Sequence, residues 1–167
     1  MSGRAAGGLS HPGGHDVGMC QTCEGMSLDE VLHDLHHLVE RFGWAVLGVD
    51  APRPWAYTIG LADRYGHPEL VLVGVATSLA TNVLNALGTM VATGEGLRPG
   101  GKDVVVGEME LTFGAVHPVH IAAGLVGRWE AYYGWRPGPA PSLEVVQVLP
   151  LPGRRFSLDK PHTTLEI

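Results

Sequence analysis

The chain has 167 residues, of which 45% are hydrophobic, so it can fold around a core of its own. Its 11 basic and 17 acidic residues give a formal net charge of −6, which argues against nucleic acid and anionic membranes as partners. Its apolar runs are too short to span a bilayer, its N-terminus lacks an apolar segment of signal-peptide length, and two cysteines make no disulfide framework, so we expect a cytoplasmic protein.

The sequence predicts three regions. Residues 1–18 are rich in glycine and show no apolar periodicity, which predicts a disordered tail. Residues 19–150 contain all the strong helix and strand signals and are expected to form a single α+β domain. Residues 151–167 are expected to form a loosely ordered C-terminal segment.

Helix signals occur in three places. The strongest helix is predicted over 27–42, where Ser27 and Glu30 have the spacing of a capping box and apolar residues recur at helical spacing. A second helix is predicted over 78–93 for the same reason of periodicity. A weaker third is predicted over 121–134, where two glycines disfavour a helix by about 1 kcal/mol each.

Short segments rich in β-branched and aromatic residues, bounded by glycine and proline, predict the strands. These segments lie at 44–50, 55–62, 69–75, 104–116 and 142–152. The first three follow one another directly, which predicts an antiparallel meander. Strands that neighbour each other in sequence, with two or three helices packed on them, favour the α+β class with an antiparallel sheet of about five to six strands.

A C-x-x-C pair, Cys20 and Cys23, stands just before the first helix. Two thiolates are half of a tetrahedral zinc site, and His33 and His37, one helical turn apart, would supply two more ligands. Alternatively, two copies of the chain would complete a four-thiolate site, which predicts a homodimer. The pair is also compatible with two free thiols, and least with a redox dithiol, because no thioredoxin-type unit surrounds it.

The stretch "WAYTIGLADRYGHPELVLVG" concentrates polar side chains between two apolar runs. If the chain reverses at "DRYG", His67 and Glu69 lie opposite the end of the strand that carries Tyr57 and Thr58. A histidine beside a carboxylate has the chemistry of a base with its orienting partner, so these two are the candidate catalytic residues. The hydroxyls of Tyr57 and Thr58 are candidate ligand-binding groups. The alternative is a hairpin whose polar groups serve the turn alone.

Several segments together resemble the bacterial family called domain of unknown function 4262. These are the C-x-x-C pair, "YTIGL", "GHPEL" and "AYYG" before "EVVQV", and the resemblance runs from about Met19 to Val148. It implies a small, self-contained bacterial domain in which the N-terminal cysteines are part of the pattern. It implies no reaction.

Three functions are compatible with these residues. The favoured one is an accessory domain that binds a small molecule or a metal, with its pocket at the YTIGL/GHPEL hairpin. The second is a flavin-dependent redox enzyme, because the hairpin is similar to the opening strands of the flavin-binding split barrels. The third is a protein-interaction module, such as an immunity or regulatory partner. Of the cofactors, zinc is favoured over flavin.

Overall fold

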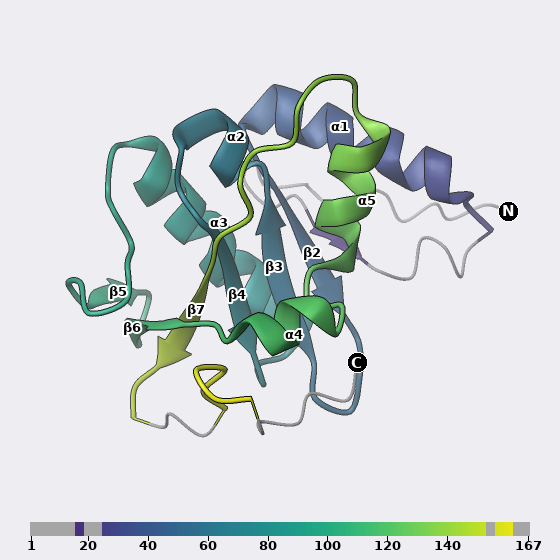
Figure 1. Cartoon of the computed structure of the whole chain (residues 1–167). Coiled ribbons are helices and arrows are strands. Elements are labelled where there is room, and N and C mark those ends of the chain that lie inside the picture. The colour runs from purple at the N-terminus through teal and green to yellow at the C-terminus, as the bar shows by residue number, and fades with distance from the viewer. Residues whose placement is uncertain (1–15, 19–24, 153–155, 162–167) are drawn as a thin grey trace, which may run out of the picture.

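The computed structural model describes residues 16–18, 25–152 and 156–161. Within these ranges the chain forms one sheet with helices on both faces (Figure 1). The described strands are β1 (Asp16–Gly18), β2 (Ala45–Val49), β3 (Trp55–Ile59), β4 (Glu69–Val73), β5 (Val104–Val106), β6 (Met109–Ala115) and β7 (Val145–Pro150). The described helices are α1 (Leu28–Phe42), α2 (Leu61–Tyr65), α3 (Thr77–Ala92), α4 (Pro118–Ala122) and α5 (Gly127–Trp135).

The described sheet is mixed, with seven strands in the order β1-β2-β3-β4-β7-β6-β5. Strands β2, β3 and β4 form the antiparallel meander that the sequence predicts. However, β1 pairs in parallel with β2, and β4 pairs in parallel with β7. The α+β class is confirmed, but the prediction of a purely antiparallel sheet is wrong. Three helices and a hairpin separate β4 from β7 in the chain, so strand signals alone give no indication of this pairing.

The helices follow the sequence signals closely at two of the three predicted places. Helix α1 begins at the predicted capping box, in which the Ser27 hydroxyl accepts from the Glu30 amide and the Glu30 carboxylate accepts from the Ser27 amide. Helix α3 also lies where it is predicted. The third predicted helix is two shorter ones, α4 and α5, because the chain turns at Gly124 with φ 98°. None of the described helices is long and apolar enough to cross a membrane.

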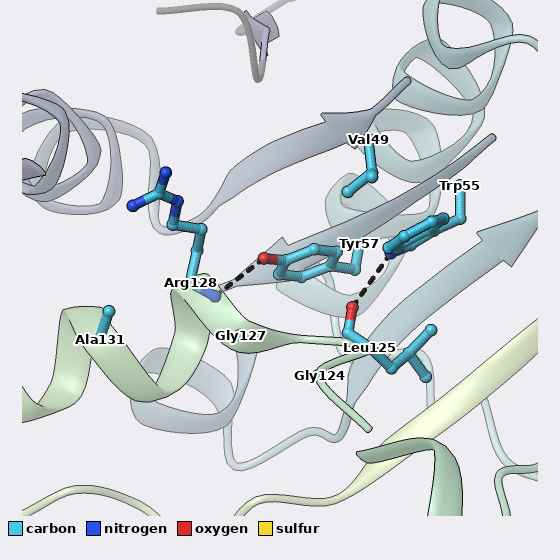
Figure 2. Close-up of a pocket in the computed structure, with 8 residues that line it drawn as sticks. All are labelled: Val49, Trp55, Tyr57, Gly124, Leu125, Gly127, Arg128 and Ala131. Atoms are coloured by element: carbon cyan, nitrogen blue, oxygen red, sulfur yellow. Dashed lines mark hydrogen bonds between the residues drawn. The ribbon is translucent and has the colours of Figure 1, made fainter. Parts of the chain in front are cut away.

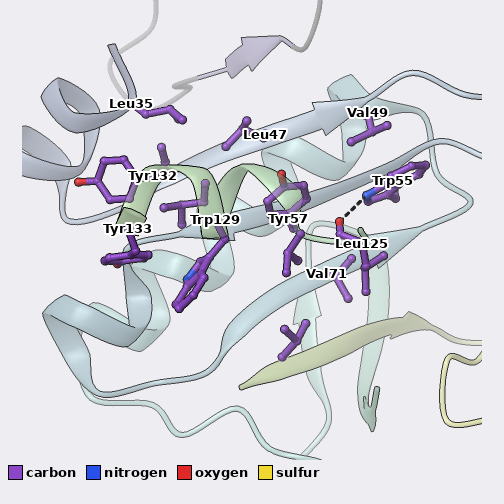
Figure 3. Close-up of a cluster of buried hydrophobic side chains, with 14 of the residues drawn as sticks. Leu35, Leu47, Val49, Trp55, Tyr57, Val71, Leu125, Trp129, Tyr132 and Tyr133 are labelled. Carbon is purple, nitrogen blue, oxygen red and sulfur yellow. Dashed lines mark hydrogen bonds between the residues drawn. The ribbon is translucent and has the colours of Figure 1, made fainter. Parts of the chain in front are cut away.

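Two apolar cores lie on opposite faces of the sheet. The first is enclosed by α1 and α5, and Figure 3 shows its aromatic residues from α5 beside Leu35 of α1. The second lies beneath α3, with Leu84 and Leu87 fully buried against the other face. Helix α5 therefore packs over the same face of β3 and β4 as α1 does, and this position brings it to the hairpin.

The structure describes parts of both regions outside the predicted domain, and the division into three regions remains a prediction. Residues 16–18 of the predicted tail form β1 at the edge of the sheet, and residues 1–15 lie outside the described part of the chain. In the predicted loose C-terminal segment, Leu158 is fully buried and its amide donates to the Gln147 side chain at 2.6 Å. Its carbonyl accepts from the His117 amide at 2.7 Å, so this part of the segment packs against the domain.

Candidate functional site

The β3–β4 hairpin opens at one end, and this opening organises the polar residues of the site. Regular pairing ends at Tyr57, which lies opposite Val71. Beyond that point the Leu70 amide donates to the Thr58 hydroxyl at 2.9 Å, so a side chain replaces the backbone acceptor. The Thr58 hydroxyl in turn donates to the Glu69 carboxylate at 2.7 Å. The structure therefore brings Thr58 and Glu69 together, as the hairpin predicts.

The Glu69 carboxylate fills the opening between the two strands. It accepts from the amides of Gly60 at 2.9 Å, Ala62 at 3.3 Å and Leu61 at 3.4 Å, which begin α2. It also accepts from the indole N–H of Trp129 on α5 at 3.2 Å. With Thr58 this makes five donors around a side chain that has no exposed surface. Glu69 thus connects the hairpin, α2 and α5.

Burial raises the pKa of Glu69 to about 7, against the opposing effect of its hydrogen bonds to Thr58, Gly60, Ala62 and Trp129. The folded chain then holds a proton, between about pH 4.5 and 7, that the unfolded chain releases. The contribution of Glu69 to the free energy of unfolding therefore falls by about 3 kcal/mol in total as the pH rises through that window.

The Glu69→Gln variant isolates this effect, because it removes the titration and leaves every other ionisable group in place. We expect the parent's advantage in unfolding free energy over Glu69→Gln to be larger at pH 5 than at pH 8. Denaturant unfolding at both values measures it. A larger advantage at pH 8 would mean that the five hydrogen bonds to the anion outweigh its burial.

His67 belongs to a different network from Glu69. The residue is 5% exposed, its Nδ1 lies 2.7 Å from the Pro68 carbonyl, and its Nε2 accepts from the Leu97 amide at 2.9 Å. These partners assign the proton to Nδ1. Burial is the main cause that lowers the pKa of His67. Both ring nitrogens of His67 therefore have a hydrogen-bond partner, whereas a base needs a free ring nitrogen. The catalytic role of His67 and Glu69 remains a prediction.

Tyr57 lies on the opposite face of β3 from Thr58, as strand alternation requires. Its hydroxyl accepts from the Arg128 amide at 3.1 Å, and the Trp55 indole donates to the Leu125 carbonyl at 3.0 Å (Figure 2). The two rings and the segment that they contact line an open pocket of about 390 Å³, here called the Tyr57 pocket. Its lining residues are Val49, Trp55, Tyr57, Gly124, Leu125, Gly127, Arg128 and Ala131. Thr58 is not among them.

Sequence reasoning missed the wall of this pocket that comes from α5 and the turn before it. The stretch from Gly124 to Arg128 appears in sequence only as a weak helix interrupted by glycines. The available signal was the pair Gly124 and Gly127, which leaves backbone without side chains beside the aromatic strand "WAY". Trp129 was missed as well, because only the fold brings its indole to Glu69.

The helix α5 is held in place by contacts beyond Glu69. The centroids of the Trp129 and Tyr133 rings lie 4.5 Å apart. Figure 3 shows both side chains on α5. Arg136, at the end of α5, forms an ion pair with Asp63 of α2. These contacts support the wall that α5 contributes to the Tyr57 pocket.

The predicted zinc ligands are only partly within the described structure. Cys20 and Cys23 lie outside the described residues. The Nδ1 of His33 lies 3.0 Å from the Asp29 carbonyl, and its ring packs edge-on against Trp135 at 4.7 Å. The side chain of His37 is exposed on α1. The described ranges contain no group of three or more His, Cys, Asp or Glu residues that could hold a metal ion, so zinc binding remains a prediction.

Comparison with known proteins gives one match. Neither the curated proteins nor the solved structures contain a match to this chain. A family model, described as domain of unknown function (DUF4262), matches residues 38–151, which is more than half of the chain. The match includes YTIGL, GHPEL and the Tyr57 pocket, but it begins after Cys20, Cys23, His33 and His37. With this match across the hairpin, the pocket and most of the sheet, the chain belongs to the DUF4262 family.

Proposed function

We propose that this chain is a small-ligand-binding domain and that its ligand occupies the Tyr57 pocket. The observation that carries the proposal is the pocket itself. Its volume of about 390 Å³ falls in the range of small-molecule sites, which are concave and mostly apolar with few polar groups. Trp55 and Tyr57 give it two aromatic walls, and Gly124 and Gly127 leave backbone open to close approach.

These walls favour a flat, largely apolar ligand. Aromatic rings stack on such ligands or meet them edge to face, and each such pair adds about 0.5–1.5 kcal/mol beyond the burial of area. Both rings are fixed before binding, since the Trp55 indole and the Tyr57 hydroxyl are hydrogen-bonded to Leu125 and Arg128. Fixed side chains lose little entropy when a ligand binds, which supports affinity in a pocket of this size.

The hairpin residues act in this proposal as positioning residues. Glu69 connects the opened end of the hairpin to Trp129, and Trp129 belongs to the helix whose first turn lines the pocket. Thr58 holds Glu69 by a hydrogen bond of 2.7 Å. The buried carboxylate would have to be uncovered before it touched a ligand, which favours binding over catalysis for this site.

A glycine in the lining of the pocket allows a test. A Cβ on Gly127 meets no atom within 4 Å, so Gly127→Leu adds a side chain at the pocket wall without a clash at Cβ. We expect this variant to weaken the binding of uncharged aromatic fragments such as indole, quinoline and 2-naphthol by about tenfold or more, because the side chain occupies their space. Ligand-observed NMR titration measures the change.

The matched control is Gly134→Leu, a substitution in the same helix. A Cβ on Gly134 also meets no atom within 4 Å, and Gly134 lies outside the lining of the Tyr57 pocket. This variant should bind the fragments as the parent does. Equal binding by the parent and Gly127→Leu, or no binding to the parent, would contradict the proposal.

Zinc binding at Cys20 and Cys23 is proposed as a second function, on the C-x-x-C pair alone. Two thiolates at this spacing form half of a tetrahedral site, to be completed by His33 and His37 or by a second copy of the chain. Protein kept reduced and never chelated should contain about one zinc per two chains or more, and Cys23→Ser should lower that content. Metal analysis decides this, and an absorbance scan of the same sample tests for flavin.

A further inference from the structure

A second pocket lies at the other side of the GHPEL turn, where three separate segments of the chain meet. It has a volume of about 290 Å³ and is here called the His67 pocket. Its walls come from α2 and the turn into β4, from the loop after α3, and from the segment before β7. The lining residues are Ala62, Gly66, His67, Pro68, Arg98, Pro141, Ser142 and Glu144.

The GHPEL turn fixes the two segments that bring charges to this pocket. The His67 ring accepts from the Leu97 amide at 2.9 Å, which holds the residue next to Arg98. The Glu69 amide donates to the Glu144 carbonyl at 2.9 Å, which holds the backbone that carries the Glu144 side chain. Histidine and glutamate in this motif therefore position a cation and an anion around one cavity.

Arg98 and Glu144 do not neutralise each other. Both are exposed, and in the described part of the chain neither side chain has a hydrogen bond or an ion pair within 4.0 Å. Arg98 and His67 line the same pocket, where burial and, after it, the Arg98 guanidinium lower the pKa of His67. The cavity thus carries two opposite, solvent-exposed charges that form no ion pair with each other or with another described residue.

We propose that the His67 pocket binds a small zwitterion of the amino-acid class. Its carboxylate pairs with the Arg98 guanidinium, which suits carboxylates because its N–H groups form a planar fork. Its ammonium group pairs with the Glu144 carboxylate, and the Ser142 hydroxyl supplies a further hydrogen bond. Pro68 and Pro141 form rigid walls for a short side chain.

The charge arrangement selects against simpler ligands. An anion such as phosphate would meet the repulsion of Glu144, and an amine without a carboxylate would meet that of Arg98. A single carboxylate is also too few ligands for a divalent cation. Only a ligand that carries both a negative and a positive charge can pair with both Arg98 and Glu144.

Calorimetric titration of the full chain with individual free amino acids, such as alanine, serine and proline, tests this proposal. Each amino acid that binds is compared with its N-acetyl derivative, which lacks the ammonium group, and with its amide, which lacks the carboxylate. We expect the free amino acid to bind about tenfold or more tightly than either derivative, because each lost charged hydrogen bond weakens binding by that order.

Variants assign the two charges to their residues. Arg98→Gln should no longer bind the free amino acid more tightly than its amide. Glu144→Gln should no longer bind the free amino acid more tightly than its N-acetyl derivative. The controls Lys102→Gln and Glu95→Gln change exposed charges outside the pocket and should bind as the parent does. Gly127→Leu should also bind as the parent, since it alters only the Tyr57 pocket.

Two results would overturn the zwitterion site. One is the absence of binding to any amino acid at millimolar concentration in folded parent protein. The other is that both Arg98→Gln and Glu144→Gln still bind the free amino acid more tightly than its amide and its N-acetyl derivative. Thermal melts of each variant confirm that the chain is folded in either case.

Discussion

Replacement of Glu69 by alanine is expected to lower the free energy of unfolding by about 3–5 kcal/mol. The carboxylate accepts from five donors in a site without exposed surface, so its removal leaves buried N–H groups of α2 and the Trp129 indole without a partner. Each such group costs about 1–3 kcal/mol, and the vacated volume adds to the loss. Chemical denaturation of parent and variant at pH 7 measures the difference.

The control for this variant is Glu110→Ala. Glu110 is an exposed residue of β6, and surface substitutions of this kind change stability by about 0.5 kcal/mol or less. If Glu69→Ala were as stable as Glu110→Ala, the carboxylate would be dispensable to the hairpin. Its position would then have to be explained by function alone.

Gly60→Ala is expected to have an effect of similar size, about 3–5 kcal/mol, since backbone strain and overpacking each cost about 1–3 kcal/mol. Gly60 has φ 116°, where side chains are disfavoured, and a Cβ there would lie 2.8 Å from the Gly43 carbonyl oxygen. It would also lie 3.0 Å from the Trp44 Cα, so the obstructing atoms are backbone and cannot move aside easily. Thermal or denaturant unfolding measures the loss.

The other end of α2 offers the matched control. Gly66 also has positive φ, at 60°, but a Cβ there meets no atom within 4 Å. Gly66→Ala should therefore cost about 1 kcal/mol, the penalty of the left-handed conformation alone. Equal losses in Gly60→Ala and Gly66→Ala would show that the close approach of Gly60 to the backbone of Gly43 and Trp44 is unimportant. The glycine in YTIGL would then be explained by its positive φ alone and not by a lack of space for a Cβ.

Local signals predicted the parts of the fold that depend on local physics. The capping box at Ser27 and the periodicity of α1 and α3 arise within one helix, and the meander arises between strands that follow each other. The parallel pairing of β4 with β7 and the strand β1 depend on backbone hydrogen bonds between distant segments. Hydrophobic patterns contain no information about such partners. Helix α2 was missed because its five residues are too few for a periodic pattern.

The same distinction applies to the site. The hairpin predicts Thr58 close to Glu69, and a hydrogen bond of 2.7 Å joins them. Tyr57, which the sequence assigns to the same ligand site as Thr58, lines a pocket that Thr58 does not reach. The partners of His67 and Tyr57 were beyond prediction, since Leu97 comes from the loop after α3 and Arg128 from the first turn of α5, both distant in sequence. His67 and Glu69 are predicted as a catalytic pair because they lie two residues apart in sequence, and that role remains a prediction. In the fold they serve separate networks on either side of the turn.

The Trp55 indole N–H reports most directly on the central claim that the Tyr57 pocket binds a small ligand. It lines the pocket and is hydrogen-bonded to Leu125, so a ligand stacked there must shift its ¹⁵N–¹H resonance. Titration of ¹⁵N-labelled protein with the aromatic fragments, with Trp55→Phe to assign the signal, is the measurement. We expect a saturable shift of the Trp55 signal that is lost in Gly127→Leu and kept in Gly134→Leu. A Trp55 signal that stays unchanged while other indole signals move would contradict the account.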